Sequence, residues 1–212
     1  MKIVILGSAH PLRGGLASYN ERLAREFMNQ GHDVDIYTFS LQYPEFLFPG
    51  TTQYSTEPAP KDLKIHVKVN SVNPFNWQKV GREIAALKPE MLVVKFWLPF
   101  MAPSLGRICR LVKANGITKV VAILDNIVPH EKRIGDRMLA SYFVNSVDAF
   151  VAMSDSVLNE LSQFDKTKPR AVSPHPLFDN FGEAVTKKEA YRHLGLALNE
   201  EHLLFFGFIR DY

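Results

Sequence analysis

The sequence is poor in cysteine: among its 212 residues there is a single one, Cys109. One thiol excludes a disulfide within the chain and any metal site built from several cysteines. No uninterrupted apolar run approaches the roughly 18 to 20 residues that a membrane-spanning helix needs. The first residues also lack the cleavage pattern of a signal peptide. We therefore expect a soluble, cytoplasmic chain.

The motifs of several enzyme classes are missing as well. No G-x-G-x-x-G fingerprint follows the first apolar segment, and no G-K-[ST] completes a P-loop. Neither H-E-x-x-H nor H-x-x-x-H occurs, so we expect no metal site. The absence of G-x-S-x-G argues against a serine hydrolase. Net charge is only +3, from 25 basic and 22 acidic residues, so we expect no nucleic-acid partner, which would require a concentrated basic face.

What the sequence does contain is an alternation of short apolar runs and amphipathic segments. The expected strands cover residues 2–7, 33–39, 63–69, 90–96, 118–124 and 147–154, with a short one in 170–174. Most of the segments between them repeat apolar residues at helical spacing. Strands separated by helices of ten or more residues form a parallel sheet covered on both faces. The sequence therefore predicts an α/β fold with a Rossmann-like, doubly wound parallel sheet.

In such a fold the ligand site lies at the carboxyl ends of the strands. The pattern places glycines and polar residues from separate stretches at that edge: Gly14, Gly15, Lys95, Asp125, Asn126, His130, Ser154 and His175. A collection of titratable groups at one edge favours a functional role over a purely structural one.

A glycine pair, Gly14 and Gly15, stands between the first expected strand and the following helix. Backbone amides and the positive end of the helix dipole suit a phosphate at such a position. The alternative is that the two glycines only permit a tight turn. The neighbouring Arg13 adds a cation to a phosphate site or extends into solvent.

The stretch LDNIVPHE, residues 124–131, ends a buried strand with polar side chains. His130 beside Glu131 can hold a proton or orient a hydroxyl group. Asp125 and Asn126 face the same edge. The alternative is local capping, in which Glu131 complements a helix N-terminus and Asp125 or Asn126 satisfies loop amides.

A stretch of mixed aromatic and basic character follows the fourth expected strand. Its residues are Trp97, Phe100, Arg107, Arg110 and Lys113. They could form a basic, aromatic surface in peripheral contact with lipid at the inner face of the membrane. We favour a buried aromatic turn followed by a solvated helix face.

The chain is expected to divide into three parts. Residues 1–178 form the Rossmann-like domain, and residues 179–200 form a connecting segment with a short helix. A capping box at Thr186 and Glu189 marks the start of that helix. Residues 201–212 resemble the first strand of a second domain that has been cut off.

Several stretches together resemble the amino-terminal half of family 4 glycosyltransferases of the GT-B architecture. They are RGGLASYNERLAREFMNQGHDVDIYTF, LDNIVPHE, DAFVAMSDSVLNEL, KKEAYRHLGL and LLFFGFIRDY. Their order and spacing run through the whole chain. The resemblance identifies the chain as the acceptor-side domain of such an enzyme.

The resemblance implies a retaining transfer of a sugar from a nucleotide diphosphate donor to an acceptor hydroxyl, without a cofactor or metal. The acceptor would be a carbohydrate or a lipid-linked sugar, and the nucleotide would be held largely by a carboxyl-terminal domain of the same chain. We expect three groups of site residues. The catalytic ones are His130, Asp125 and Asn126. The donor-phosphate ligands are Gly14, Gly15, Arg13 and Arg210. The acceptor contacts are Glu131, Lys95 and Ser154.

The sequence departs from the family pattern at two points. Many relatives carry His-Asn where this chain has Asp125 and Asn126. The Lys-Gly pair and the Glu-x7-Glu element of the second domain do not occur before the sequence ends at Tyr212. We therefore expect little or no transfer by this chain alone. A non-catalytic sugar-binding or nucleotide-binding α/β module remains as the alternative, and an oxidoreductase or epimerase is disfavoured because the dinucleotide fingerprint and a Tyr-x-x-x-Lys pair are missing.

Overall fold

The computed structural model describes residues 1–44, 52–128, 134–177 and 182–205. The chain forms two compact units, Met1–His175 and Pro176–Tyr212. Within the described part, no helix is long and apolar enough to cross a bilayer.

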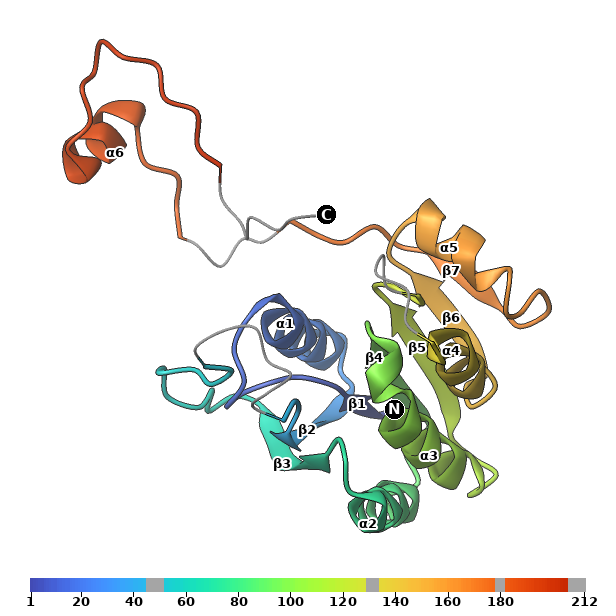
Figure 1. The fold of residues 1–212 in the computed structure, drawn as a ribbon. Coiled ribbons are helices and arrows are strands. Elements are labelled where there is room, and N and C mark those ends of the chain that lie inside the picture. Colours follow the sequence, from blue (N-terminus) through green and yellow to red (C-terminus); the bar gives the residue numbers. More distant parts are fainter. Residues whose placement is uncertain (45–51, 129–133, 178–181, 206–212) are drawn as a thin grey trace. The chain divides into compact units, whose positions relative to one another are not determined.

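The first unit is built on a seven-stranded sheet in which every pair of neighbouring strands is parallel (Figure 1). The strand order is β3-β2-β1-β4-β5-β6-β7. The strands are β1 (Lys2–Leu6), β2 (Asp33–Leu41), β3 (Lys64–Asn70), β4 (Met91–Phe96), β5 (Lys119–Leu124), β6 (Ala149–Ala152) and β7 (Arg170–Val172). The chain reverses its direction of progress across the sheet between β3 and β4. The predicted Rossmann-like, doubly wound sheet is therefore confirmed.

Helices cover the two faces of the sheet unequally. On one face, α1 (Gly15–Asn29) packs against apolar side chains of β1, β2 and β4. On the other, α2 (Pro74–Ala86), α3 (Ala102–Lys113) and α4 (Asp136–Val144) share the larger core. Figure 1 shows α1 on one side of the sheet and α2 and α3 on the other. The short α5 (Asp155–Leu161) contributes Val157 and Leu161 to the larger core.

Alternation along each strand explains both cores. In β1, Ile3 and Ile5 belong to the α1 side, whereas Val4 and Leu6 belong to the other side. Both sets are fully buried, which is the arrangement that a continuous apolar run predicts for a strand covered on both faces.

Several predicted elements have different limits in the structure: β6, for example, covers Ala149–Ala152, whereas the expected strand covered residues 147–154. The sequence pattern of residues 131–146 also predicts a helix. Residues 131–133 lie outside the described residues, and α4 begins at Asp136, because Gly135 stands before it in a left-handed conformation with φ 96°. A residue with this φ interrupts a right-handed helix, and glycine adopts it without steric cost. Of the strand expected within residues 201–212, residues 201–205 have no regular structure, and the remainder lies outside the described residues.

The second unit contains α6 (Lys187–Leu194). The expected capping box is confirmed: the Thr186 side chain accepts from the Glu189 amide, and the Glu189 carboxylate accepts from the Thr186 amide. Gly195 ends the helix with φ 70°. This helix buries none of its residues, so local capping, rather than core packing, defines its ends.

Candidate functional site

The glycine loop presents an uncapped helix N-terminus. Gly14 precedes α1 with φ 101° and ψ 177°, and no side-chain hydrogen bond from the described residues caps the helix. The first turn carries no acidic residue. Backbone amides at this end can therefore donate hydrogen bonds to an anion, which the helix dipole also favours. Gly14 is required by its dihedral angles, which are essentially restricted to glycine.

Backbone contacts fix the path of this loop. The Arg13 amide donates to the Gln53 carbonyl (2.9 Å), and Leu12 forms an antiparallel bridge with Tyr54. Farther back, the Ala9 amide donates to Thr38 Oγ1 (2.8 Å). The main chain is thus held in place while the Arg13 side chain is exposed.

Gly7 allows α1 to lie close to the sheet. A Cβ atom at Gly7 would lie 2.5 Å from Asn20 Nδ2 and 3.2 Å from Lys95 Cβ. The same Asn20 amide group donates to the Ser8 carbonyl (2.8 Å). Because Gly7 has no side chain, the second turn of α1 can lie close to the backbone after β1 and to Lys95 in β4.

Lys95 and Asp125 form a buried ion pair at the carboxyl edge of the sheet. Lys95 Nζ lies 2.8 Å from Asp125 Oδ1, and the exposed fractions of the two side chains are 1% and 19%. Lys95 is paired with Ile123 in the β4–β5 register, so the ion pair connects β4 to the residue that follows β5. Burial lowers the pKa of Lys95, and the Asp125 carboxylate partly offsets this effect.

The ring of Tyr19 covers the ammonium group. Lys95 Nζ lies 3.6 Å from the centroid of that ring, well within the range of a cation–π interaction. Burial and the nearby Asp125 carboxylate raise the pKa of Tyr19. The ring centroids of Tyr19 and His175 are 5.4 Å apart, so the end of the first unit also reaches this cluster.

The second carboxylate oxygen of Asp125 has no hydrogen-bond partner among the described residues. Asp125 Oδ2 is buried and forms no hydrogen bond with the described residues, while the Asp125 amide donates to the Phe96 carbonyl (3.0 Å). An unsatisfied buried acceptor is costly and requires an explanation. A hydroxyl group of a bound ligand could supply the missing donor.

The remaining expected site residues are distributed as follows. Ser154 begins α5, where its hydroxyl accepts from the Val157 amide (3.3 Å), and Asn126 is exposed next to Asp125. His130, Glu131 and Arg210 lie outside the described residues. Among the residues that the structure describes, no three His, Cys, Asp or Glu side chains gather as a metal site would require.

Sequence reasoning missed Tyr19 and Asn20 as parts of this edge. Tyr19 fits the apolar stripe of α1, and only the tertiary structure shows it above Lys95. The available signal was Lys95 itself, a charged residue inside the apolar strand MLVVKF. A buried charge requires a partner, and the nearest carboxylate at the same sheet edge is Asp125.

Comparisons with known proteins agree with this architecture. Residues 13–175 match the sequence profile of Glycosyltransferase Family 4. A search of curated proteins by sequence finds no significant match.

Solved structures share the fold at low sequence identity. An alpha-glucosyltransferase in complex with UDP matches with a TM-score of 0.52 and 14% identity, over 88% of this chain and 42% of that one. An alpha-glucosyltransferase in complex with UDP-glucose and DNA containing an abasic site matches with a TM-score of 0.54 and 11% identity, over 82% and 42%. The chain thus spans about two fifths of the length of these proteins.

Proposed function

The chain belongs to glycosyltransferase family 4, and on this premise we propose that it forms the acceptor-side half of a retaining glycosyltransferase. The observation that carries the proposal is the pairing of two features on one sheet edge. These are, among the described residues, the uncapped N-terminus of α1 after Gly14 and the unpartnered oxygen of Asp125. The first suits a donor diphosphate, and the second suits a sugar hydroxyl.

The donor is a nucleotide diphosphate sugar. Its diphosphate would bind to the amides at Gly14 and Gly15, where the helix dipole favours negative charge. Arg13 and Arg210 would supply cations, as charge builds up on the leaving group during transfer. Binding of UDP by the alpha-glucosyltransferase of similar fold makes a uridine nucleotide a suitable first probe.

Asp125, Asn126 and His130 would lie beside the transferred sugar, and Glu131 and Ser154 beside the acceptor. We assign Lys95 to a different task from the acceptor contact expected for it, because its ammonium group is buried and paired. Lys95 would position Asp125 by engaging Oδ1, which leaves Oδ2 for a hydroxyl group of the sugar.

Transfer with retention would require a second Rossmann-like domain that closes over the donor. The amides of one loop only partly stabilise a diphosphate leaving group, and a closed cleft is needed to exclude water. We therefore propose that residues 1–212 bind a donor weakly and transfer little or no sugar. The acceptor is a carbohydrate or lipid-linked hydroxyl in the cytoplasm, and the DNA in the solved complexes belongs to those proteins.

Gly14→Ala is expected to weaken UDP-glucose binding by at least about tenfold. A Cβ atom strains the backbone at φ 101° and ψ 177°, so the loop would shift and redirect the amides. Isothermal titration calorimetry with UDP-glucose measures the effect, and urea unfolding measures the accompanying loss of stability.

The matched control is Gly31→Ala, at the other end of α1. Gly31 also has a positive φ, of 81°, and no atom within 4 Å of an added Cβ. This variant should lose stability but keep the affinity of the wild type. Equal UDP-glucose affinity in Gly14→Ala and wild type would contradict the proposed donor site, and rapid sugar transfer by residues 1–212 would contradict the proposed dependence on a second domain. Donor binding that never leads to transfer, even with a complete enzyme, would favour the binding-module alternative.

A further inference from the structure

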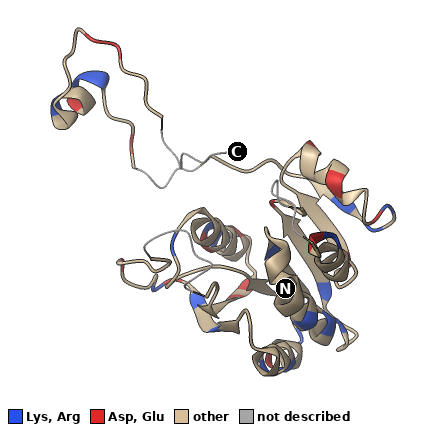
Figure 2. Cartoon of the chain, in the orientation of Figure 1, with Lys and Arg blue, Asp and Glu red and all other residues tan. Residues whose placement is uncertain are grey.

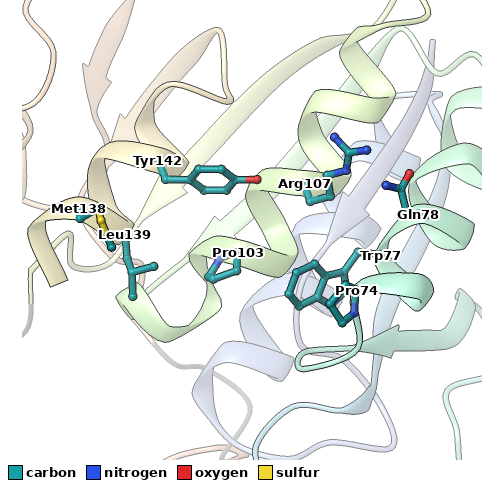
Figure 3. Close-up of a pocket in the computed structure, with 8 residues that line it drawn as sticks. All are labelled: Pro74, Trp77, Gln78, Pro103, Arg107, Met138, Leu139 and Tyr142. Atoms are coloured by element: carbon teal, nitrogen blue, oxygen red, sulfur yellow. The ribbon is translucent and has the colours of Figure 1, made fainter. Parts of the chain in front are cut away.

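An apolar groove of about 450 Å³ lies between the first halves of α2 and α3 and the middle of α4 (Figure 3). Its volume falls in the range of small-molecule sites. Its walls include Pro74 and Trp77 from α2, Pro103 from α3, and Leu139 and Tyr142 from α4. Because each helix follows the carboxyl end of a strand, the groove opens near the ligand edge, but on the opposite face of the sheet from α1.

Large apolar side chains at and beside the groove remain in contact with water. Phe75, which follows Pro74, is 86% exposed, and Met138, in the wall of the groove, is 71% exposed. Ile134, just before α4, is fully exposed. Single exposed apolar residues are ordinary, but Met138 lies in the wall of an apolar groove and Phe75 is next in sequence to its lining residue Pro74, a combination that favours an interaction site.

The helical layer around the groove is basic. Six basic and two acidic residues lie in α2, α3 and α4, whereas the whole chain carries a net charge of only +3. Figure 2 shows the basic residues along α3, a helix without an acidic residue. The three helices that line the groove therefore carry a formal net charge of +4, although α5 on the same face adds two acidic residues.

Arg107 is the cation that the groove itself contains. The other two basic residues of α3 are engaged: Arg110 lies 3.8 Å from the ring centroid of Tyr142, and Lys113 Nζ lies 2.6 Å from Asp148 Oδ1. Arg107 forms no ion pair or hydrogen bond with the described residues. Its guanidinium group is therefore available to an external anion, for which it offers several donors.

The aromatic residues of the lipid-contact alternative, Trp97 and Phe100, do not line this groove. Trp97 Nε1 donates to the Tyr43 hydroxyl, and the ring of Phe100 stacks on that of Tyr43 with centroids 6.2 Å apart. Both residues pack against the larger core. They form the internal aromatic turn that we favoured from the sequence, so lipid contact would have to involve other residues.

We propose that the groove and its rim dock on a bilayer that contains anionic phospholipid. An acyl chain enters the groove, Phe75 and Met138 enter the interface, and Arg107 pairs with a lipid phosphate. Apolar side chains surrounded by basic residues are the combination that binds such surfaces. The excess of basic over acidic residues favours this occupant over a protein partner, which would need an acidic complementary face.

The docking surface is independent of the proposed transfer reaction. UDP-glucose would bind on the loop before α1, which covers the other face of the sheet, so vesicle binding and UDP-glucose binding can be measured separately. If vesicle binding fails, the UDP-glucose titration still tests the proposed function. If UDP-glucose binding fails, the vesicle experiment still tests the docking surface.

Cosedimentation with vesicles tests the proposal on residues 1–212. We expect at least tenfold tighter binding to vesicles of equal parts phosphatidylglycerol and phosphatidylcholine than to phosphatidylcholine alone. Binding should weaken in 0.5 M salt, because salt screens exposed charges. Binding should also alter the fluorescence of Trp77, which we would record in a Trp97→Phe background.

Two variants locate the contact. Phe75→Ser combined with Met138→Ser should weaken vesicle binding at least tenfold, and Arg107→Gln should weaken it several-fold. The matched controls are Leu87→Ser, at the far end of α2 and 43% exposed, and Arg22→Gln, on the exposed surface of α1. Both should bind vesicles as the wild type does, and urea unfolding verifies that all variants are folded.

Three outcomes would overturn the proposal. They are equal binding to anionic and neutral vesicles, unchanged binding of the groove variants, and no vesicle binding at all. Dodecyl phosphate below its micellar concentration provides a further test. If it binds at Arg107 while vesicles do not, the groove is a site for a free amphiphile and the bilayer proposal is wrong.

Discussion

Asp125→Ala is expected to lower the free energy of unfolding by about 3–5 kcal/mol, the range for breaking a buried ion pair by removing one partner. Lys95 would then carry an uncompensated charge with only 1% of its side chain exposed. Urea unfolding monitored by circular dichroism measures the loss. Asp62→Ala is the matched control, because it removes a carboxylate 2.6 Å from Arg25 in a pair whose two side chains are 41% and 53% exposed. It should cost less than about 1 kcal/mol.

The loss of stability in Asp125→Ala should also depend on pH, and it should be larger at neutral pH than at high pH. Burial already lowers the pKa of Lys95 in the wild type, and Asp125 opposes that effect. Without Asp125 the folded-state pKa falls further below the unfolded value, so the unfolded chain binds more protons than the folded chain. The free energy of unfolding must then rise with pH in that window. The difference in free energy of unfolding between Asp125→Ala and wild type should therefore become smaller from neutral pH to about pH 10.

A double-mutant cycle separates the ion pair from other effects. Asp125→Ala combined with Lys95→Met removes both charges, and stability should return to within about 2 kcal/mol of wild type. If the two losses simply add, the pair is not coupled and the assigned role of Lys95 as the residue that positions Asp125 is wrong.

Tyr19→Ala is expected to lower the free energy of unfolding by about 2–4 kcal/mol, because it removes a packed ring and a cation–π contact together. That ring lies 3.6 Å from Lys95 Nζ and covers a charge that is otherwise enclosed by Asp125 and Met153. Tyr19→Phe keeps the ring and should stay within about 0.5 kcal/mol of wild type. Thermal and urea unfolding of both variants provide the comparison.

The contrast between these two variants decides the interpretation. Similar losses in Tyr19→Phe and Tyr19→Ala would show that the hydroxyl group, and not the ring, is the important part. Tyr19→Ala should also weaken the coupling between Lys95 and Asp125 in the cycle above, because water that enters the site screens the pair.

The sheet could be predicted from sequence because its central strands are apolar on both faces. Short apolar runs such as KIVIL in β1 and KVVAIL in β5, alternating with helical segments, are typical of strands in a covered parallel sheet. The start of α4 was harder to predict from the sequence. The polar residues before it fit a helical pattern, and the decisive feature is the left-handed conformation of Gly135.

The candidate site was predictable as an edge but not as a set of contacts. Asp125 follows β5 directly, so its position depends only on where a strand ends. Its pairing with Lys95 also depends on the β4–β5 register and on the direction of the lysine side chain. Neither can be deduced from the local sequence. Tyr19 depends on how closely α1 approaches the sheet, which the absent side chain of Gly7 permits.

The buried ion pair also restricts how this protein can evolve. A single replacement at Lys95 or Asp125 passes through an intermediate with an uncompensated charge, so the two positions should change together across descendants and relatives. Chains with histidine at the position of Asp125 should accordingly lack a lysine at the position of Lys95, since two bases there would repel each other once protonated. Paired sequences from many genomes would reveal this correlation as covariation between the end of β4 and the residue after β5, and independent variation at the two positions would contradict it.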